Sequence, residues 1–190
     1  MFKNLLKIIS GDCVVINIKN TNVYPIFKNG KSSIFQYAKN HNCQTFINND
    51  ISLLNNITVF VRNPYERLVS GINTVINFES ILDIDSFLND VENYNFIDKH
   101  FTPQFLWLFH LNKYYQGDVT IKGIEDLLTF ISLREKPNVP AVDIELKNKI
   151  NERRFKKYTD VDYFFINKFK NRTIKLKTII EEGYDFLSKN

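Results

Sequence analysis

The feature that most constrains the fold is an unbroken apolar run that leads directly into an arginine and a proline. The run is Ile57–Val61, and such a run is typical of a strand buried on both faces of a parallel sheet. Arg62 follows at once, and Pro64 suits the first turn of a helix, where its missing N–H costs no hydrogen bond. We expect this helix to run to about Asn77. A strand that ends in arginine beside a helix start is a place to hold a phosphate group.

Other segments alternate between strand and helix patterns. Further strands are expected at Val14–Ile18, Val23–Phe27 and Asp118–Gly123, with a turn at Asn20–Asn22. Further helices are expected from Ser32 or Ser33 to Lys39, from Asp83 or Asp85, from Gln104 to Lys113 with Thr102 and Pro103 at its start, from Ile124 to Ser132, and over most of the chain from Asp143 on. A loop is expected at Lys136–Val142. This alternation predicts an α/β fold with a central, mainly parallel sheet flanked by helices.

Composition sets broad limits on the class of protein. The 190 residues favour one domain over residues 1–190, with a helical, basic C-terminal part from about residue 143. A hydrophobic fraction of 44% allows a substantial core, and a formal charge of +4 does not by itself indicate nucleic-acid binding. Residues 147–177, however, hold eleven Lys and Arg against three Asp and Glu. They form either solvated helix faces or a basic wall beside an anionic cofactor or acceptor.

The cysteines and the N-terminus bear on the compartment. Cys13 and Cys43 have no metal-binding spacing and make no disulfide framework, which favours a reducing compartment. Lysines interrupt the apolar residues at the start of the chain, so no signal peptide is predicted, and no stretch is apolar enough to span a membrane. We therefore expect a soluble, cytoplasmic protein.

A second anion cradle is predicted before the first long helix. Gly30 lets the backbone turn tightly, Ser32 and Ser33 supply hydroxyl donors, and Lys28 and Lys31 supply charge. The free N–H groups of the helix that follows would face the same ligand. Since ligands of parallel sheets bind beyond the carboxyl ends of strands, this cradle and Arg62 are expected at one edge. Two anion sites in a small domain suggest a ligand with two separated anionic groups.

The cradle is close to a nucleotide-triphosphate P-loop but departs from it. The end of the P-loop pattern fits Gly30, Lys31 and Ser32, whereas its first glycine is replaced by Pro25. A P-loop protein would place an acidic partner for Mg²⁺ at the end of the strand Ile57–Val61. Arg62 stands at that position. The cradle therefore suits a ligand that needs no metal.

These segments resemble the carbohydrate branch of the sulfotransferases that use 3′-phosphoadenosine 5′-phosphosulfate (PAPS). Phe27–Ser33 resembles the motif Pro-Lys-x-Gly-x-[ST]-[ST], with Phe27 in place of the proline, and Arg62–Ser70 matches Arg-[DN]-Pro-[FY]-x-Arg-x-x-Ser. Weaker likenesses in the right order are His100–Gln104 to His-x-x-Pro-Gln, Val119–Leu127 to a strand–Glu–Leu segment, and Tyr158–Phe165 to a late Tyr-Asp-Phe ending. The resemblance spans Val23 to about Phe169.

The resemblance implies a P-loop-like three-layer fold and transfer of a sulfuryl group from PAPS to a hydroxyl or amine of a carbohydrate-like acceptor. It implies that the 5′-phosphosulfate is bound by Lys28, Asn29, Gly30, Lys31, Ser32 and Ser33. Arg62 and Ser70 would bind the 3′-phosphate, and no metal is implied. We expect Lys28 to be catalytic, stabilising charge on the departing nucleotide, and Arg67 to pair with a local carboxylate.

A general base must take the acceptor's proton, and three histidines are available. His100 is the first candidate, because it precedes a helix start in the family-like segment. His41 and Asp50, which follow the first cradle, are alternatives. His110, like Trp107, lies in an apolar run and is expected to pack in the core.

Two other functions stay open. One is a P-loop kinase-like NTPase, and the other is a non-catalytic domain that binds a nucleotide or a polyanion through residues 147–177. For the sulfotransferase, the partner is a small-molecule or glycan acceptor, and its pocket is expected in the segments Glu79–Lys99 and Leu133–Val142.

Overall fold

A six-stranded sheet forms the centre of the protein. The computed structural model describes residues 9–131, 144–151 and 153–189. The predicted loop at residues 136–142 lies outside them. The strands are β1 (Val14–Ile18), β2 (Thr21–Tyr24), β3 (Thr45–Ile47), β4 (Asn56–Val61), β5 (Asp118–Gly123) and β6 (Thr173–Lys175), in the sheet order β3-β1-β2-β4-β5-β6.

The sheet is mixed, so the prediction of a mainly parallel sheet was wrong. Only β2 with β4 and β4 with β5 pair in parallel, whereas β1 pairs antiparallel with β2 and β3, and β6 antiparallel with β5. The first hairpin has a physical cause. Lys19 and Asn20 both have positive φ, 48° and 62°, which is the geometry of a tight two-residue turn. The turn therefore precedes the predicted Asn20–Asn22, and β2 begins at Thr21 and ends before Pro25.

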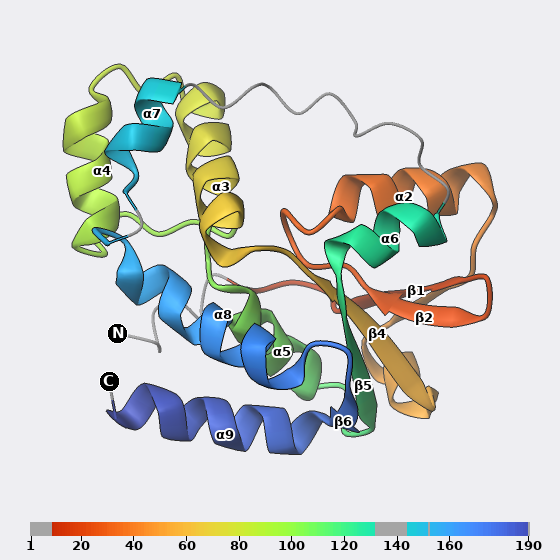
Figure 1. The fold of residues 1–190 in the computed structure, drawn as a ribbon. Coiled ribbons are helices and arrows are strands. Elements are labelled where there is room, and N and C mark those ends of the chain that lie inside the picture. The colour runs from red at the N-terminus through yellow and green to blue at the C-terminus, as the bar shows by residue number, and fades with distance from the viewer. Residues whose placement is uncertain (1–8, 132–143, 152, 190) are drawn as a thin grey trace.

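Helices cover both faces of the sheet (Figure 1). The described helices are α2 (Lys31–Asn40), η1 (Asn48–Leu53), α3 (Pro64–Phe78), α4 (Ile84–Glu92), α5 (Gln104–Asn112), α6 (Ile124–Phe130), α7 (Ile144–Lys149), α8 (Lys156–Phe169) and α9 (Leu176–Lys189). The apolar residues of α2 and α6 pack on one face, where they meet Ile16, Ile18 and Phe60. The helices α5, α8 and α9 pack on the other face.

The predicted buried strand, β4, contributes to the core on both faces of the sheet. In β4, Ile57, Val59 and Val61 join the core with α5, α8 and α9, and Phe60 joins the core with α2 and α6. All four of these side chains are at most 3% exposed. An apolar run buried on both faces is what a strand between two helical layers requires.

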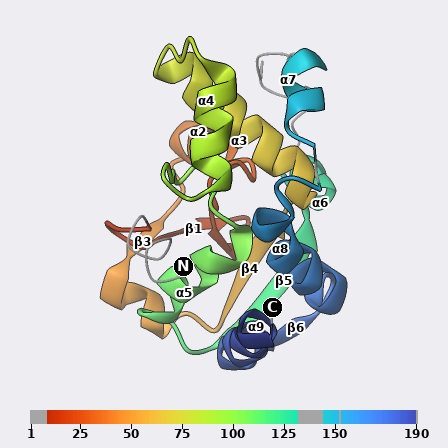
Figure 2. The same ribbon diagram turned by 90° about the vertical axis from the view of Figure 1, so that its left-hand side faces the viewer.

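A third group of helices lies beyond the carboxyl ends of the parallel strands. There α3, α4 and α7 pack together with the start of α8 around their own apolar cluster (Figures 1 and 2). Asp83 caps α4 by accepting from Ser86 N at 2.9 Å, as one of the two predicted starts required. The helix α3 therefore stands at the edge of the sheet where Arg62 was expected.

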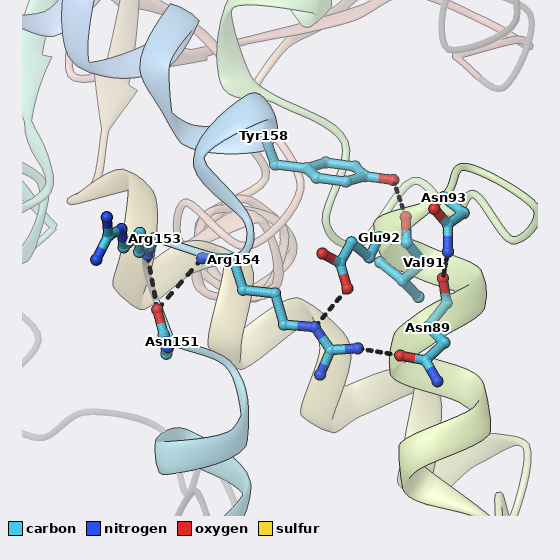
Figure 3. Close-up of polar contacts among 8 residues, drawn as sticks. All are labelled: Asn89, Val91, Glu92, Asn93, Asn151, Arg153, Arg154 and Tyr158. Carbon is cyan, nitrogen blue, oxygen red and sulfur yellow. Dashed lines mark hydrogen bonds and ion pairs between the residues drawn. The ribbon is translucent and has the colours of Figure 1, made fainter.

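The segment between residues 79 and 99 is tied to α8 (Figure 3). The guanidinium of Arg154 donates to Glu92 Oε2 at 2.6 Å and to Asn89 Oδ1, both on α4. The Tyr158 hydroxyl donates to the carbonyl of Val91 at 2.8 Å. The α4 part of this segment is thus a fixed helix. Among the described residues, no helix has both the length and the apolar character to cross a bilayer.

Candidate functional site

The two predicted anion loops leave neighbouring parallel strands. Tyr24, the last residue of β2, pairs with Val59 of β4. The segment after β2 runs to α2, and the segment after β4 runs to α3. Because parallel neighbours end at the same edge of a sheet, both loops open on one side of the molecule.

The first loop is a tight turn with an unusual backbone. The N–H of Asn29 donates to the carbonyl of Ile26 at 3.1 Å, and Lys28 adopts φ 64°, which is uncommon for a residue with a Cβ. Gly30 follows with φ 77° and is the N-cap of α2, so the predicted caps Ser32 and Ser33 were wrong. A Cβ at Gly30 would lie 2.5 Å from Leu127 Cδ2, so both space and backbone favour glycine.

Asn29 anchors this loop to the protein interior. Its side chain is buried, and its Nδ2 donates to the carbonyl of Phe60 at 2.9 Å and to Gln104 Oε1 at 2.6 Å. The side chain thus faces inward, away from any ligand held by the loop backbone.

The second loop begins α3 with good capping geometry. Asn63 Oδ1 accepts from Glu66 N at 3.0 Å, and Pro64 occupies the first turn as predicted. The Arg62 side chain is 30% exposed and lies 3.5 Å from the exposed Glu66 carboxylate. A contact of this kind at the surface is weak, so Arg62 stays available to an anion.

The structure brings Lys28 to the second loop. Its Nζ donates to Thr74 Oγ1 on α3, and the same hydroxyl donates to the carbonyl of Ser70, one turn earlier. Burial lowers the pKa of Lys28, and the charges of Arg62 and Arg67 lower it further. Lys28, Arg62 and Ser70, selected from two separate motifs, therefore share one region.

Arg67 is a buried cation between the two loops. It is 1% exposed, and its Nε donates to the carbonyl of Phe27 at 3.1 Å. Burial lowers its pKa to about 10, against the opposing charge of Asp162. That carboxylate comes from α8, so the prediction of a local partner was wrong. The Nη2 atom is buried and has no hydrogen-bond partner among the described residues.

Gln104 joins the two loops, and the sequence did not single it out as a site residue. Its Oε1 accepts from the backbone N–H of Arg62 at 2.8 Å as well as from Asn29, and its Nε2 donates to the carbonyl of Arg62 at 2.8 Å. The only available signal was its place at the end of the His-x-x-Pro-Gln segment.

Asp162 caps the helix that carries Gln104. Its two carboxylate oxygens accept from the backbone N–H groups of Gln104 and Phe105, each at 2.8 Å. Thr102 and Pro103 were both expected at the start of this helix. Pro103 is the N-cap, whereas the Thr102 hydroxyl donates to the carbonyl of Asp98. Burial raises the pKa of Asp162, while Arg67 and the hydrogen bonds favour its charged form.

The rest of the first motif begins α2. Ser32 is exposed and Ser33 half-buried in the first turn of the helix. The Nζ of Lys31 lies 3.7 Å from the ring centroid of Phe27. Lys31 thus reaches across the loop to an aromatic ring, while Lys28 reaches to α3.

His100 is held by a neighbouring carboxylate close to the loops. Its Nδ1 lies 2.5 Å from Asp98 Oδ1, which also accepts the His100 backbone N–H at 2.7 Å. The ring meets Phe27 edge-on, with centroids 5.5 Å apart. A Cβ at Gly71, beside Ser70, would lie 2.3 Å from the carbonyl oxygen of His100, so α3 packs closely on this segment.

The alternative bases lie elsewhere. His41 is exposed at the far end of α2, where it stacks on Tyr37, and Asp50 is exposed in η1. Ten helical residues, about 15 Å, separate His41 from the first loop. His110 is buried as predicted, and burial lowers its pKa. Both of its ring nitrogens are in contact, with Tyr24 Oη and the carbonyl of Gly11, each at 3.1 Å.

In the part of the chain that the structure describes, no three His, Cys, Asp or Glu side chains gather as metal ligands. Comparison of the chain with models of protein families, with curated proteins and with solved structures finds no match. What the site does must therefore be argued from its own residues.

Proposed function

We propose that the protein is a sulfotransferase that moves the sulfuryl group of PAPS to a hydroxyl or amine of a carbohydrate-like acceptor. One observation carries the proposal: three cations, Lys28, Arg62 and Arg67, gather where the loops after β2 and β4 meet. Lys28 Nζ donates to Thr74 on α3, and Arg67 Nε donates to the carbonyl of Phe27 in the first loop. In this proposal the loop before α2 is the counterpart of a P-loop, and the fold is P-loop-like with a mixed sheet.

The residues present fit an anionic nucleotide. The charges that act on the Lys28 ammonium are both positive, so a bound phosphate would relieve their repulsion. Arg67 Nη2 is a buried donor with no partner among the described residues, and such a donor is costly unless something accepts from it. Gly30 caps α2, and the free N–H groups in the first turn of that helix suit an anion.

Each residue has a distinct role in this proposal. When bound, PAPS supplies a sulfuryl group on a phosphate that departs readily. Lys28 stabilises the negative charge that grows on the departing oxygen. Arg62 and Ser70 hold the 3′-phosphate, the first as a two-pronged donor and the second through its hydroxyl. Asn29 positions the first loop from within, and Gln104 positions both loops.

His100 is the proposed base. Because the Asp98 carboxylate engages Nδ1, the neutral ring carries its proton there and leaves Nε2 free to accept the acceptor's proton. We expect His100→Gln to lower kcat by about 10²–10⁴. A variant that retains kcat would remove His100 from this role.

Calorimetry with adenosine 3′,5′-bisphosphate tests the function directly. We expect saturable binding that needs no Mg²⁺ and is stronger than binding of ATP or AMP. Arg62→Ala removes the guanidinium group, so its affinity for adenosine 3′,5′-bisphosphate should be roughly tenfold to a hundredfold weaker than that of the wild type. This is the scale for a charge-assisted hydrogen bond. Lys39→Ala, at the exposed end of α2, is the matched control. Equal affinity in wild type and Arg62→Ala, or Mg²⁺-dependent ATP binding, would overturn the assignment.

A further inference from the structure

A cavity opens beside the first loop, where Pro25 and Phe27 line it. It has a volume of about 250 Å³ and is bounded by β1, β2, α2, α5 and the segment before α5. Two stacked aromatic rings, those of Phe27 and Trp107, line it with centroids 5.1 Å apart and planes at 29°. Sites for drug-sized ligands begin at roughly 300 Å³, so this cavity suits a ligand of about one ring.

Two lysines face this aromatic wall from different elements. The Nζ of Lys31, on α2, lies 3.7 Å from the Phe27 ring centroid, and the Nζ of Lys99 lies 5.3 Å from the same centroid. Burial lowers the pKa of Lys31, and the charge of Lys99 lowers it further. Two like charges over one ring repel each other, and an anion held between them would remove that cost.

The other polar groups of the cavity are largely engaged. Asp12 also lines the wall, and its carboxylate accepts from Asn48 Nδ2 at 2.8 Å. His110 has both ring nitrogens in contact with Tyr24 and Gly11. Trp107 differs, because its buried Nε1 has no hydrogen-bond partner among the described residues. The wall thus offers two ammonium groups against one carboxylate.

The cavity adjoins the proposed reaction centre. Phe27 directly precedes Lys28, and its ring meets the ring of His100 edge-on at 5.5 Å. A ligand resting on Phe27 therefore lies close to the proposed base.

We propose that this cavity is the acceptor site and that it takes a sugar ring bearing a carboxylate or sulfate group. Trp107 and Lys31 already cover the Phe27 ring, so the rims of the two aromatic rings contact the apolar face of the sugar. Lys31 and Lys99 bind the anionic group. Lys31 is thereby assigned to the acceptor, and not to the 5′-phosphosulfate as the resemblance implied. That the bound sugar is the acceptor rests on the proposed function, whereas the binding of an anionic sugar does not.

The single tryptophan makes the test specific, because Trp107 gives the one indole N–H signal of the chain in a ¹H–¹⁵N spectrum. The wild-type protein is titrated with D-glucuronate, with neutral D-glucose and with inorganic sulfate. We expect D-glucuronate to shift the indole signal saturably. We expect it to bind at least about tenfold more tightly than D-glucose. Lys31→Gln and Lys99→Gln should each remove most of this difference, and Lys31→Arg should retain it. Lys39→Gln is the control.

Three results would overturn the inference. They are no indole shift with D-glucuronate, equal affinity for D-glucuronate and D-glucose, and equal response to inorganic sulfate alone. Adenosine 3′,5′-bisphosphate provides a further arm. If this nucleotide displaces D-glucuronate, the cavity belongs to the nucleotide and the inference fails. The titration needs no nucleotide and no turnover, so its failure is distinct from failure of the nucleotide calorimetry.

Discussion

Lys28 combines three uncommon properties in one residue. Its backbone is left-handed with φ 64°, its side chain is half-buried, and two arginine charges act on it. A non-glycine residue held in such a conformation costs on the order of 1–3 kcal/mol, and residues of this kind gather at active sites. From this left-handed turn the Lys28 side chain reaches Thr74 on α3.

Lys28→Ala should remove one preorganised donor for developing negative charge. We expect kcat to fall by about 10²–10³ while the affinity for adenosine 3′,5′-bisphosphate changes much less. The measurement is transfer of labelled sulfate from PAPS to the acceptor under saturating conditions. Lys39→Ala, exposed on the same side of the sheet, should keep the wild-type rate. Unchanged turnover in Lys28→Ala would remove the catalytic role.

At the scale of elements, the sequence predicted best where local chemistry decides the structure. The strand at β4, Pro64 in the first turn of α3 and Asp83 as a cap all depend on neighbouring residues, and all were confirmed. The strands β3 and β6 were missed, because each has three residues and gains its place only by pairing with the edge of a sheet. No local pattern marks such a strand.

The candidate site was predicted in part for the same reason. Lys28, Arg62 and Ser70 belong to motifs with fixed spacing. The segments that carry them start at one edge of the sheet because β2 and β4 pair in parallel. The roles of Gln104 and Asp162 depend on contacts between residues far apart in the chain. Such contacts become visible only when α5 and α8 are packed against the sheet.

Asp162 should be among the most sensitive positions of the core. Asp162→Ala leaves the buried Arg67 charge without its counter-charge and removes two acceptors from the start of α5. We expect a loss of about 3–5 kcal/mol in the free energy of unfolding, measured by urea titration. Asp162→Asn, which keeps one acceptor, should lose less. A stability equal to wild type in Asp162→Ala would show that the cap and the counter-charge contribute little.

At the scale of the whole molecule, the basic excess of residues 147–177 is mostly compensated in three dimensions. Seven of its cations lie in ion pairs with carboxylates: Lys149 with Asp85, Arg154 with Glu92, Lys156 with Asp160, Lys168 with Glu182, Lys170 with Glu125, Lys175 with Asp118 and Lys177 with Glu181. Most of these pairs are exposed and contribute little stability. They nevertheless reduce the local positive potential, which favours solvated helix faces over a basic wall.

The protein should accordingly bind heparin weakly. We expect it to elute from immobilised heparin near physiological ionic strength, about 0.15 M, where exposed charges are screened beyond about 8 Å. Arg153→Ala and Lys157→Ala should elute with the wild type. Retention to much higher salt, with loss of retention in these two variants, would support the alternative of a polyanion-binding domain.

The bridge made by Gln104 has a consequence for protein engineering. One amide side chain holds both the Asn29 side chain and the Arg62 main chain, so the two loops depend on a shared partner in α5. A first loop transplanted from another protein would arrive without a partner for that amide and would disturb the second loop as well. An exchange of the first loop must therefore replace the loop and the start of α5 together.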